Sequence, residues 1–163
     1  MKQSKSVTTP ATTALDTAGV AYTVHSYAHD ARSTDYGLEA ATLLGIDSAQ
    51  MFKTLMVAAD REFAVALVPV AALLDLKALG AVLGLKKLAM ADPAAAQRRT
   101  GYVLGGISPL GQRNPSPVVI DASAMHWPEI FVSGGRRGIS LQLPAQELAR
   151  VTGARFAQIA NFS

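Results

Sequence analysis

The sequence of 163 residues contains no cysteine. This absence excludes disulfides, zinc–thiolate sites and a cysteine nucleophile carried by the protein itself. Charged residues are also scarce, at 17%, whereas half of the residues are hydrophobic, which excludes a largely disordered chain. The formal net charge of +3 is mildly basic, and it permits a nucleic-acid partner without requiring one.

Membrane-spanning and targeting segments are missing as well. The longest apolar run, residues 63–74, contains Pro69 and is too short to cross a bilayer. The first six residues are polar, and no apolar signal segment follows them. We therefore expect a cytoplasmic protein with a single domain over residues 8–163, preceded by a short extension at residues 1–7.

Several common catalytic motifs are absent. There is no Walker loop, no GxGxxG fingerprint and no His-Glu-x-x-His motif. Ser108 has Gly106 two residues before it but Leu110 two residues after it, whereas a nucleophile elbow needs glycine at both positions. On a strand, His25 and His29 would be about 13 Å apart, which favours two ordinary polar residues over a metal pair. The sequence thus predicts neither a metal site nor a cofactor.

The periodicity and capping residues predict a mixed α/β (α+β) domain. Thr9-Pro10, Asp75 and Asp92-Pro93 are typical of helix starts, and glycines follow the expected helix ends. Helices and strands do not alternate regularly, so we expect a mixed, barrel-like β-sheet surrounded by helices. The expected helices are 10–17, 38–44, 76–83, 93–100 and 144–151; the expected strands are 21–27, 52–58, 62–68, 88–90, 117–120, 130–133, 138–143 and 156–159.

The most informative segment is residues 101–112, hereafter the glycine loop. It holds four glycines, Ser108 and Pro109, a composition that cannot continue a helix. Such a loop exposes backbone N–H groups and lets a ligand approach closely at Gly105 and Gly106. A plain hairpin needs fewer glycines, so this loop favours a binding function.

Other candidates each have a structural alternative. Lys53 lies in the apolar run 52–55, where it either serves a site or extends its amine to solvent from a strand edge. For Tyr27 and Tyr36 the alternative is that of half-buried packing aromatics, which is the more common role of tyrosine. The run 134–138 is explained by a hairpin turn with solvated arginines.

Taken in order, these segments resemble the YbaK/EbsC family of aminoacyl-tRNA deacylases, and specifically its Cys-tRNA(Pro)/Cys-tRNA(Cys) branch. The resemblance runs from about Thr8 to near the C-terminus. It rests on the following segments: 9–11, 25–27, 29–30, 36–39, 52–55, 76–77, 90–93, 96–97, 100–102, 105–112 and 132–135.

The resemblance implies the fold of the YbaK and prolyl-tRNA synthetase editing domains, and hydrolysis of the ester that joins a wrong amino acid to tRNA. It implies that prolyl-tRNA synthetase and an aminoacylated tRNA end are partners. Arg136 and Ser140 depart from the usual family residues, which are lysine and, in some members, an acidic residue. The implied catalytic groups are Lys53 and Gly105, and the implied substrate-binding residues are Tyr27, Tyr36, Thr54, Gly106, Ile107, Ser108, Pro109, Ser133, Gly134 and Gly135.

No general base, metal site or nucleophile triad is evident, although the ester is already activated. Positioning and polarisation of the carbonyl then suffice, and the resemblance implies that the cysteinyl thiol attacks its own ester. Two alternatives stay open. One is editing of another mischarged tRNA such as Ala-tRNA(Pro); the other is a non-catalytic module that binds a tRNA end or a nucleotide.

Overall fold

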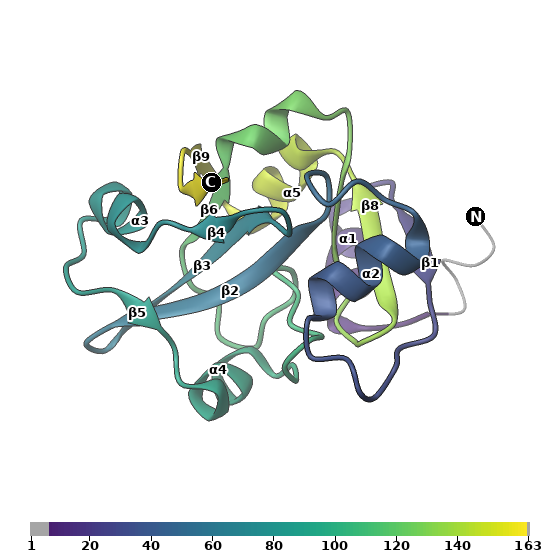
Figure 1. Ribbon diagram of the computed structural model, residues 1–163, viewed down its shortest axis with the longest axis horizontal. Coiled ribbons are helices and arrows are strands. Elements are labelled where there is room, and N and C mark those ends of the chain that lie inside the picture. Colours follow the sequence, from purple (N-terminus) through teal and green to yellow (C-terminus); the bar gives the residue numbers. More distant parts are fainter. Residues whose placement is uncertain (1–6, 163) are drawn as a thin grey trace.

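The computed structural model describes residues 7–162 (Figure 1). Its helices are α1 (Pro10–Ala18), α2 (Tyr36–Leu44), α3 (Leu76–Leu83), α4 (Pro93–Thr100), the 3-10 helix η2 (Ala122–His126) and α5 (Ala145–Thr152). Its strands are β1 (Thr23–Ser26), β2 (Phe52–Ala59), β3 (Glu62–Pro69), β4 (Leu73–Leu74), β5 (Ala89–Met90), β6 (Val118–Asp121), β7 (Ile130–Ser133), β8 (Ile139–Leu143), β9 (Arg155–Ala157) and β10 (Ala160–Asn161).

The larger sheet has five strands in the order β5-β2-β3-β6-β9. The long β2–β3 hairpin is antiparallel, and β6 and β9 add to it in parallel. Asp60 turns the hairpin with a φ of 61°, a conformation that Asp tolerates better than most residues. This hairpin runs diagonally across the centre of Figure 1.

The smaller sheet is antiparallel, in the order β1-β8-β7. A parallel bridge between Met51 and Phe131 joins its β7 strand to the entrance of β2. A further two-stranded pair, β10-β4, lies apart from both sheets in the pairing scheme. The two main sheets are thereby linked where β2 begins.

Alternation along the strands assigns each sheet face to its own hydrophobic cluster. Alternate residues of β3 and β7, such as Leu67 and Val132, join the main cluster together with α1 and α5. The opposite face of the larger sheet packs against Leu79 of α3. The opposite face of the smaller sheet packs against Ala40 and Ala41 of α2. The α2 side of the smaller sheet is therefore separate from the main core.

The helix boundaries follow from local capping. The side chains of Thr9, Asp75 and Asp92 each accept an N–H from their own first turn, as the sequence predicts. Asp35 does the same for α2, which begins two residues before the expected start. This early start brings Tyr36 into the helix.

The mixed sheet and its surrounding helices are confirmed, although the sheets stay open and do not close into a barrel. The expected extension covers residues 1–6, which lie outside the described residues, and Val7, which packs against the main core. Within residues 7–162, no helix has the length and apolar character needed to cross a membrane.

Candidate active site

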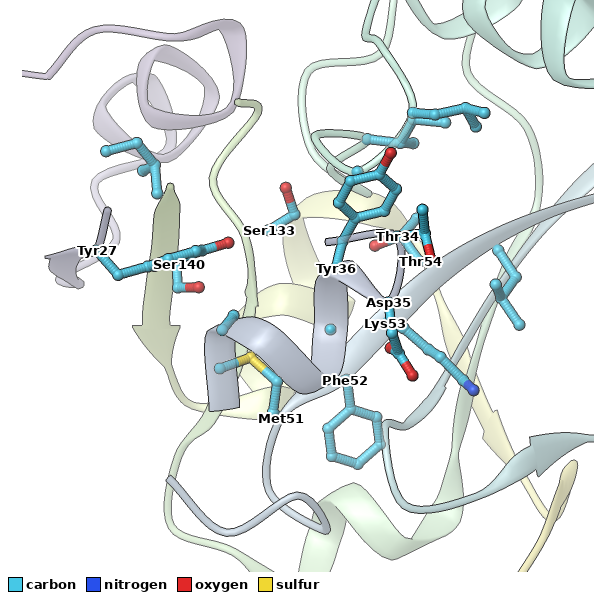
Figure 2. Close-up of a pocket in the computed structure, with 17 residues that line it drawn as sticks. Tyr27, Thr34, Asp35, Tyr36, Met51, Phe52, Lys53, Thr54, Ser133 and Ser140 are labelled. Carbon is cyan, nitrogen blue, oxygen red and sulfur yellow. The ribbon is translucent and has the colours of Figure 1, made fainter. Parts of the chain in front are cut away.

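A cavity of about 440 Å³ opens between α2, the start of β2, the glycine loop and the smaller sheet (Figure 2). Its size falls within the usual range for small-molecule sites. In Figure 2, Tyr27 and Ser140 lie on one side, Lys53 and Thr54 lie on the other, and Tyr36 projects from the start of α2 between them. Segments far apart in the sequence thus converge on one space.

One wall of the cavity is the open edge of β2. Strand β5 pairs only with Val57 and Ala58, and among residues 7–162 no strand pairs with residues 52–55 on that side. The carbonyl of Met56 accepts Ala91 N–H at this edge. Because backbone direction alternates along a strand, the N–H and C=O of Thr54 face the same edge. The cavity is therefore lined by backbone hydrogen-bonding groups as well as side chains.

Lys53 and Thr54 leave β2 on opposite faces of the sheet. Thr54 shares its face with Phe52 and Met56, which belong to the main core. The Cβ of Lys53 instead lies beside α2, 3.8 Å from where a Cβ on Gly37 would be. Both residues line the cavity because it sits at the edge of the sheet.

The hydroxyl of Thr54 is buried without a partner. Within the described residues, its Oγ1 makes no hydrogen bond. An unpaired buried hydroxyl costs folding free energy, so a structural role alone does not account for it. Because Thr54 also lines the cavity, a ligand bound there is one candidate partner for this hydroxyl.

Lys53 is half-buried and carries the positive charge of the cavity lining, whereas Asp35 carries the negative charge. Within residues 7–162, Lys53 forms no ion pair. The Asp35 carboxylate is engaged at the N-terminus of α2, where it accepts Leu38 N–H at 3.2 Å. Lys53 is thus available to an electron-rich group of a ligand.

The opposite wall is formed by Tyr27, Ser133 and Ser140. Ser133 and Ser140 are directly paired across β7 and β8. Their neighbours Val132 and Leu141 face the main core, so both serines face the α2 side. Burial raises the pKa of Tyr27, and the Glu39 carboxylate adds to the rise. The Tyr27 phenol therefore stays protonated near neutral pH and can donate a hydrogen bond.

The glycine loop closes the cavity through Leu104, Gly105 and Ile107. Gly105 has a φ of +82°, which favours glycine. Within the described residues, the Gly105 N–H has no acceptor, whereas the Gly106 N–H donates to Val103 O at 2.9 Å. Gly105 is therefore the glycine of this pair that has an N–H to offer a ligand.

The structure gathers seven of the predicted site residues around the cavity: Tyr27, Tyr36, Lys53, Thr54, Gly105, Ile107 and Ser133. The other five lie outside its lining and shape the adjoining turns. Ser108 and Pro109 belong to the buried part of the glycine loop, where Ser108 Oγ accepts Leu110 N–H at 3.2 Å. Gly106 packs against the backbone of Arg136. Gly134 accepts the Thr9 hydroxyl at 2.6 Å, and Gly135 N–H donates to Ser133 Oγ.

Sequence reasoning did not assign a role to the remaining lining residues, including Ser140. The sequence does carry a signal for Ser140, because it occupies a polar position between the apolar Ile139 and Leu141. The other unassigned lining residues are Thr34, Asp35, Gly37, Ala40, Met51, Phe52, Leu55, Leu104 and Ile139.

His25 and His29 have different partners. His25 Nε2 is 2.8 Å from Gln142 Oε1, and His29 Nδ1 is 2.8 Å from Glu39 Oε1. Glu39 also accepts Asp30 N–H at 2.7 Å. Burial alone would raise the pKa of Glu39, but the hydrogen bonds from Asp30 and His29 outweigh it and lower that pKa. Glu39 thus anchors the segment between β1 and α2, which borders the cavity.

A family model and a curated relative describe similar proteins in terms of aminoacyl-tRNA editing. A family model described as an aminoacyl-tRNA editing domain matches residues 34–151. A curated Enterococcus faecalis protein, provisionally named Cys-tRNA(Pro)/Cys-tRNA(Cys) deacylase EbsC, is 34% identical over 120 residues, or 73% of each chain.

Solved structures agree in fold. A crystal structure provisionally described as a trans-editing enzyme for prolyl tRNA synthetase matches with a TM-score of 0.83 and 26% identity, covering 95% of this chain and 99% of that one. A hypothetical protein at 22% identity also gives a TM-score of 0.83, covering 94% of this chain and 100% of its own. The latter supports the fold alone.

Proposed function

Because the chain belongs to the family of aminoacyl-tRNA editing domains, we propose that it is a deacylase that hydrolyses mischarged Cys-tRNA(Pro) in trans. The observation that carries this proposal is a single cavity whose lining includes Lys53, Thr54 with its unpartnered hydroxyl, and Gly105 with its free N–H. These are three hydrogen-bond donors without acceptors in the described residues. An ester carbonyl and a ribose end supply acceptors of the kind these donors lack.

The roles follow from the chemistry of each group. Lys53 and Gly105 N–H polarise the ester carbonyl and stabilise the negative charge that develops on its oxygen. Thr54, Tyr27 and Ser133 hold the polar groups of the aminoacyl ribose, while Tyr36 and Ile107 contribute apolar contact. Gly106, Ser108, Pro109, Gly134 and Gly135 support the backbone on which these groups stand.

The nucleophile in this proposal is the substrate thiol. The cysteinyl sulfur attacks its own ester carbonyl carbon, and the bond from that carbon to the ribose oxygen breaks. The thiol proton passes to the leaving ribose oxygen, with the adjacent ribose hydroxyl as the relay. The products are an uncharged tRNA end and a cyclic thioester, which water then opens to free cysteine.

In this proposal the protein supplies neither the nucleophile nor a metal ion. The cysteine-free chain offers no thiol of its own, and within residues 7–162 no cluster of His, Asp or Glu could hold a metal ion. The substrate thiol is already a few per cent thiolate near pH 7, as a free cysteine is. Positioning of sulfur and carbonyl is then the main task of the cavity.

Purified protein should be tested against Cys-, Ser-, Ala- and Pro-tRNA(Pro), with loss of the labelled amino acid as the readout. We expect fast loss of cysteine and a much slower loss of serine, because serine is nearly isosteric but far less nucleophilic. S-alkylation of the charged cysteine should stop the reaction. The rate should rise with pH as the substrate thiol ionises.

Other results would reassign the protein. Equal rates for the seryl and cysteinyl esters would contradict thiol attack and indicate an activated water. Preferential loss of alanine would assign editing of Ala-tRNA(Pro). Binding of tRNA without turnover of any ester would make the chain a tRNA-end or nucleotide-binding module.

We further propose that prolyl-tRNA synthetase delivers the substrate and that the reaction takes place in the cytoplasm, where mischarged tRNA forms. This is supported by the relative described as a trans-editing enzyme for that synthetase. If so, adding the synthetase should increase the deacylation rate at limiting tRNA. No increase over an unrelated synthetase would contradict delivery.

A further inference from the structure

Arg137 lies just outside the cavity lining and connects three segments of the chain. Its Nε donates to Leu104 O at 2.7 Å, which fixes it to the glycine loop. Its Cζ lies 4.7 Å from the ring centroid of Tyr36, the first residue of α2. Arg137 itself belongs to the turn between β7 and β8. One exposed side chain thus joins the loop, the helix and the turn that surround the cavity.

The backbone at Gly105 is packed so closely that the contacts of Arg137 and Tyr36 can fix its position. A Cβ on Gly105 would lie 2.7 Å from Tyr36 Cδ1 and 2.8 Å from Arg137 Nε. A Cβ on Gly106 would lie 2.9 Å from Arg136 Cα. The loop backbone is therefore pressed directly against Tyr36 and the β7–β8 turn, and the two glycines allow this approach.

The charge of Arg137 has no other described use. Within residues 7–162, Arg137 forms no ion pair, although its side chain is exposed. A planar guanidinium can donate along its edge to a carbonyl while its face stacks on an aromatic ring. The ammonium group of lysine cannot do both in this geometry.

We propose that Arg137 is a positioning residue. Its guanidinium bonds to Leu104 O and lies over the Tyr36 ring at the same time. It thereby fixes the loop backbone and holds the Gly105 N–H toward the cavity. This inference rests on the proposed deacylase activity, because Gly105 N–H is the group that it places at the ester. Arg137 acts through Gly105 and needs no contact with the substrate.

The test compares the full-length variants Arg137→Ala and Arg137→Lys with Arg136→Ala, an exposed neighbour in the same turn, on Cys-tRNA(Pro). For Arg137→Ala we expect a fall in kcat of about tenfold, as for loss of one charge-assisted contact. Its KM should change much less, and its melting temperature should stay near that of the unmodified protein. Arg137→Lys should fail to restore kcat, and Arg136→Ala should behave as the unmodified protein.

Amide hydrogen exchange supplies a readout that is independent of activity. In the free protein, Leu104 N–H bonds to Gln97 Oε1 and Gly106 N–H bonds to Val103 O. If Arg137 fixes this loop, exchange at residues 103–107 should become faster in Arg137→Ala and in Arg137→Lys, but not in Arg136→Ala. The exchange measurement tests the role of Arg137 even if no tRNA ester is hydrolysed. In that case the proposed deacylase function fails, whereas the effect of Arg137 on the loop is still decided by exchange.

Two results would overturn the proposal. The first is that Arg137→Ala raises KM, leaves kcat unchanged and weakens the salt dependence of KM, while Arg137→Lys restores the original KM. This result would show that Arg137 contacts RNA phosphate instead. The second is unchanged kcat together with unchanged exchange at residues 103–107 in Arg137→Ala, which would show that Arg137 does not control the loop.

Discussion

Tyr36 lies directly against Gly105, so that a Cβ at position 105 would be 2.7 Å from both Cγ and Cδ1 of the Tyr36 ring. The two residues are far apart in the sequence, and both line the cavity. This contact means that the glycine is required by the protein's own packing, in addition to any approach by a ligand.

Gly105→Ala should therefore displace the glycine loop and lower deacylation by at least about tenfold, a loss of roughly 1.4 kcal/mol in transition-state stabilisation. Gly19→Ala is the matched control, because Gly19 has a similar φ of +72° with nothing within 4 Å of its Cβ position. Both variants bear the strain of a left-handed residue, about 1–2 kcal/mol. Steady-state kinetics and thermal melts distinguish them, and equal activity in the two variants would contradict the packing argument.

Lys53→Ala should lower kcat/KM by about 10- to 100-fold, because one charge-assisted hydrogen bond contributes roughly 1.5–3 kcal/mol. Its thermal stability should be nearly unchanged, since within the described residues Lys53 forms no ion pair. Lys77→Ala, at an exposed position of α3, controls for the loss of one positive charge. Near-normal activity in Lys53→Ala would mean that Lys53 only extends its amine to solvent.

Thr54→Val should separate stability from activity. Valine keeps the shape of threonine and removes a buried hydroxyl that lacks a partner, so the melting temperature should stay the same or rise. Deacylation should fall by about 2- to 10-fold if that hydroxyl bonds the substrate. Ser123→Ala removes the other unpartnered buried hydroxyl of the described residues, away from the cavity, and should leave activity unchanged. A fully active Thr54→Val would remove Thr54 from the site.

Glu39 should make stability depend on pH in the acid range. The hydrogen bonds that it accepts lower its pKa below the ordinary value of 4.5, so its contribution is present above that value and is lost as pH falls through the lowered pKa. Glu39→Gln should therefore be less stable at pH 7, by about 1–3 kcal/mol. The difference in melting temperature should shrink below about pH 4.5, and a difference that is constant down to pH 3 would contradict this account.

Much of the fold is determined locally. Thr9-Pro10, Asp75 and Asp92-Pro93 start helices where the sequence predicts them, because a capping side chain and its target N–H lie within three residues of each other. Strands β4 and β10 were not predicted, because each has only two residues and the two strands pair with each other across a long stretch of the sequence. Their existence depends on a contact that no local pattern encodes.

The candidate site also combines features that local sequence predicts with features that depend on long-range packing. Residue types and spacing are enough to predict that residues 101–112 form a turn-rich loop and that Lys53 lies in an apolar strand. In contrast, the folded chain is needed to see that Ser140 and Asp35 border the same cavity as Lys53, and that Arg137 reaches Leu104 and Tyr36. These contacts depend on how α2 packs over the smaller sheet beside the open edge of β2. Such long-range packing is set by the whole hydrophobic core, and no short segment of the chain specifies it.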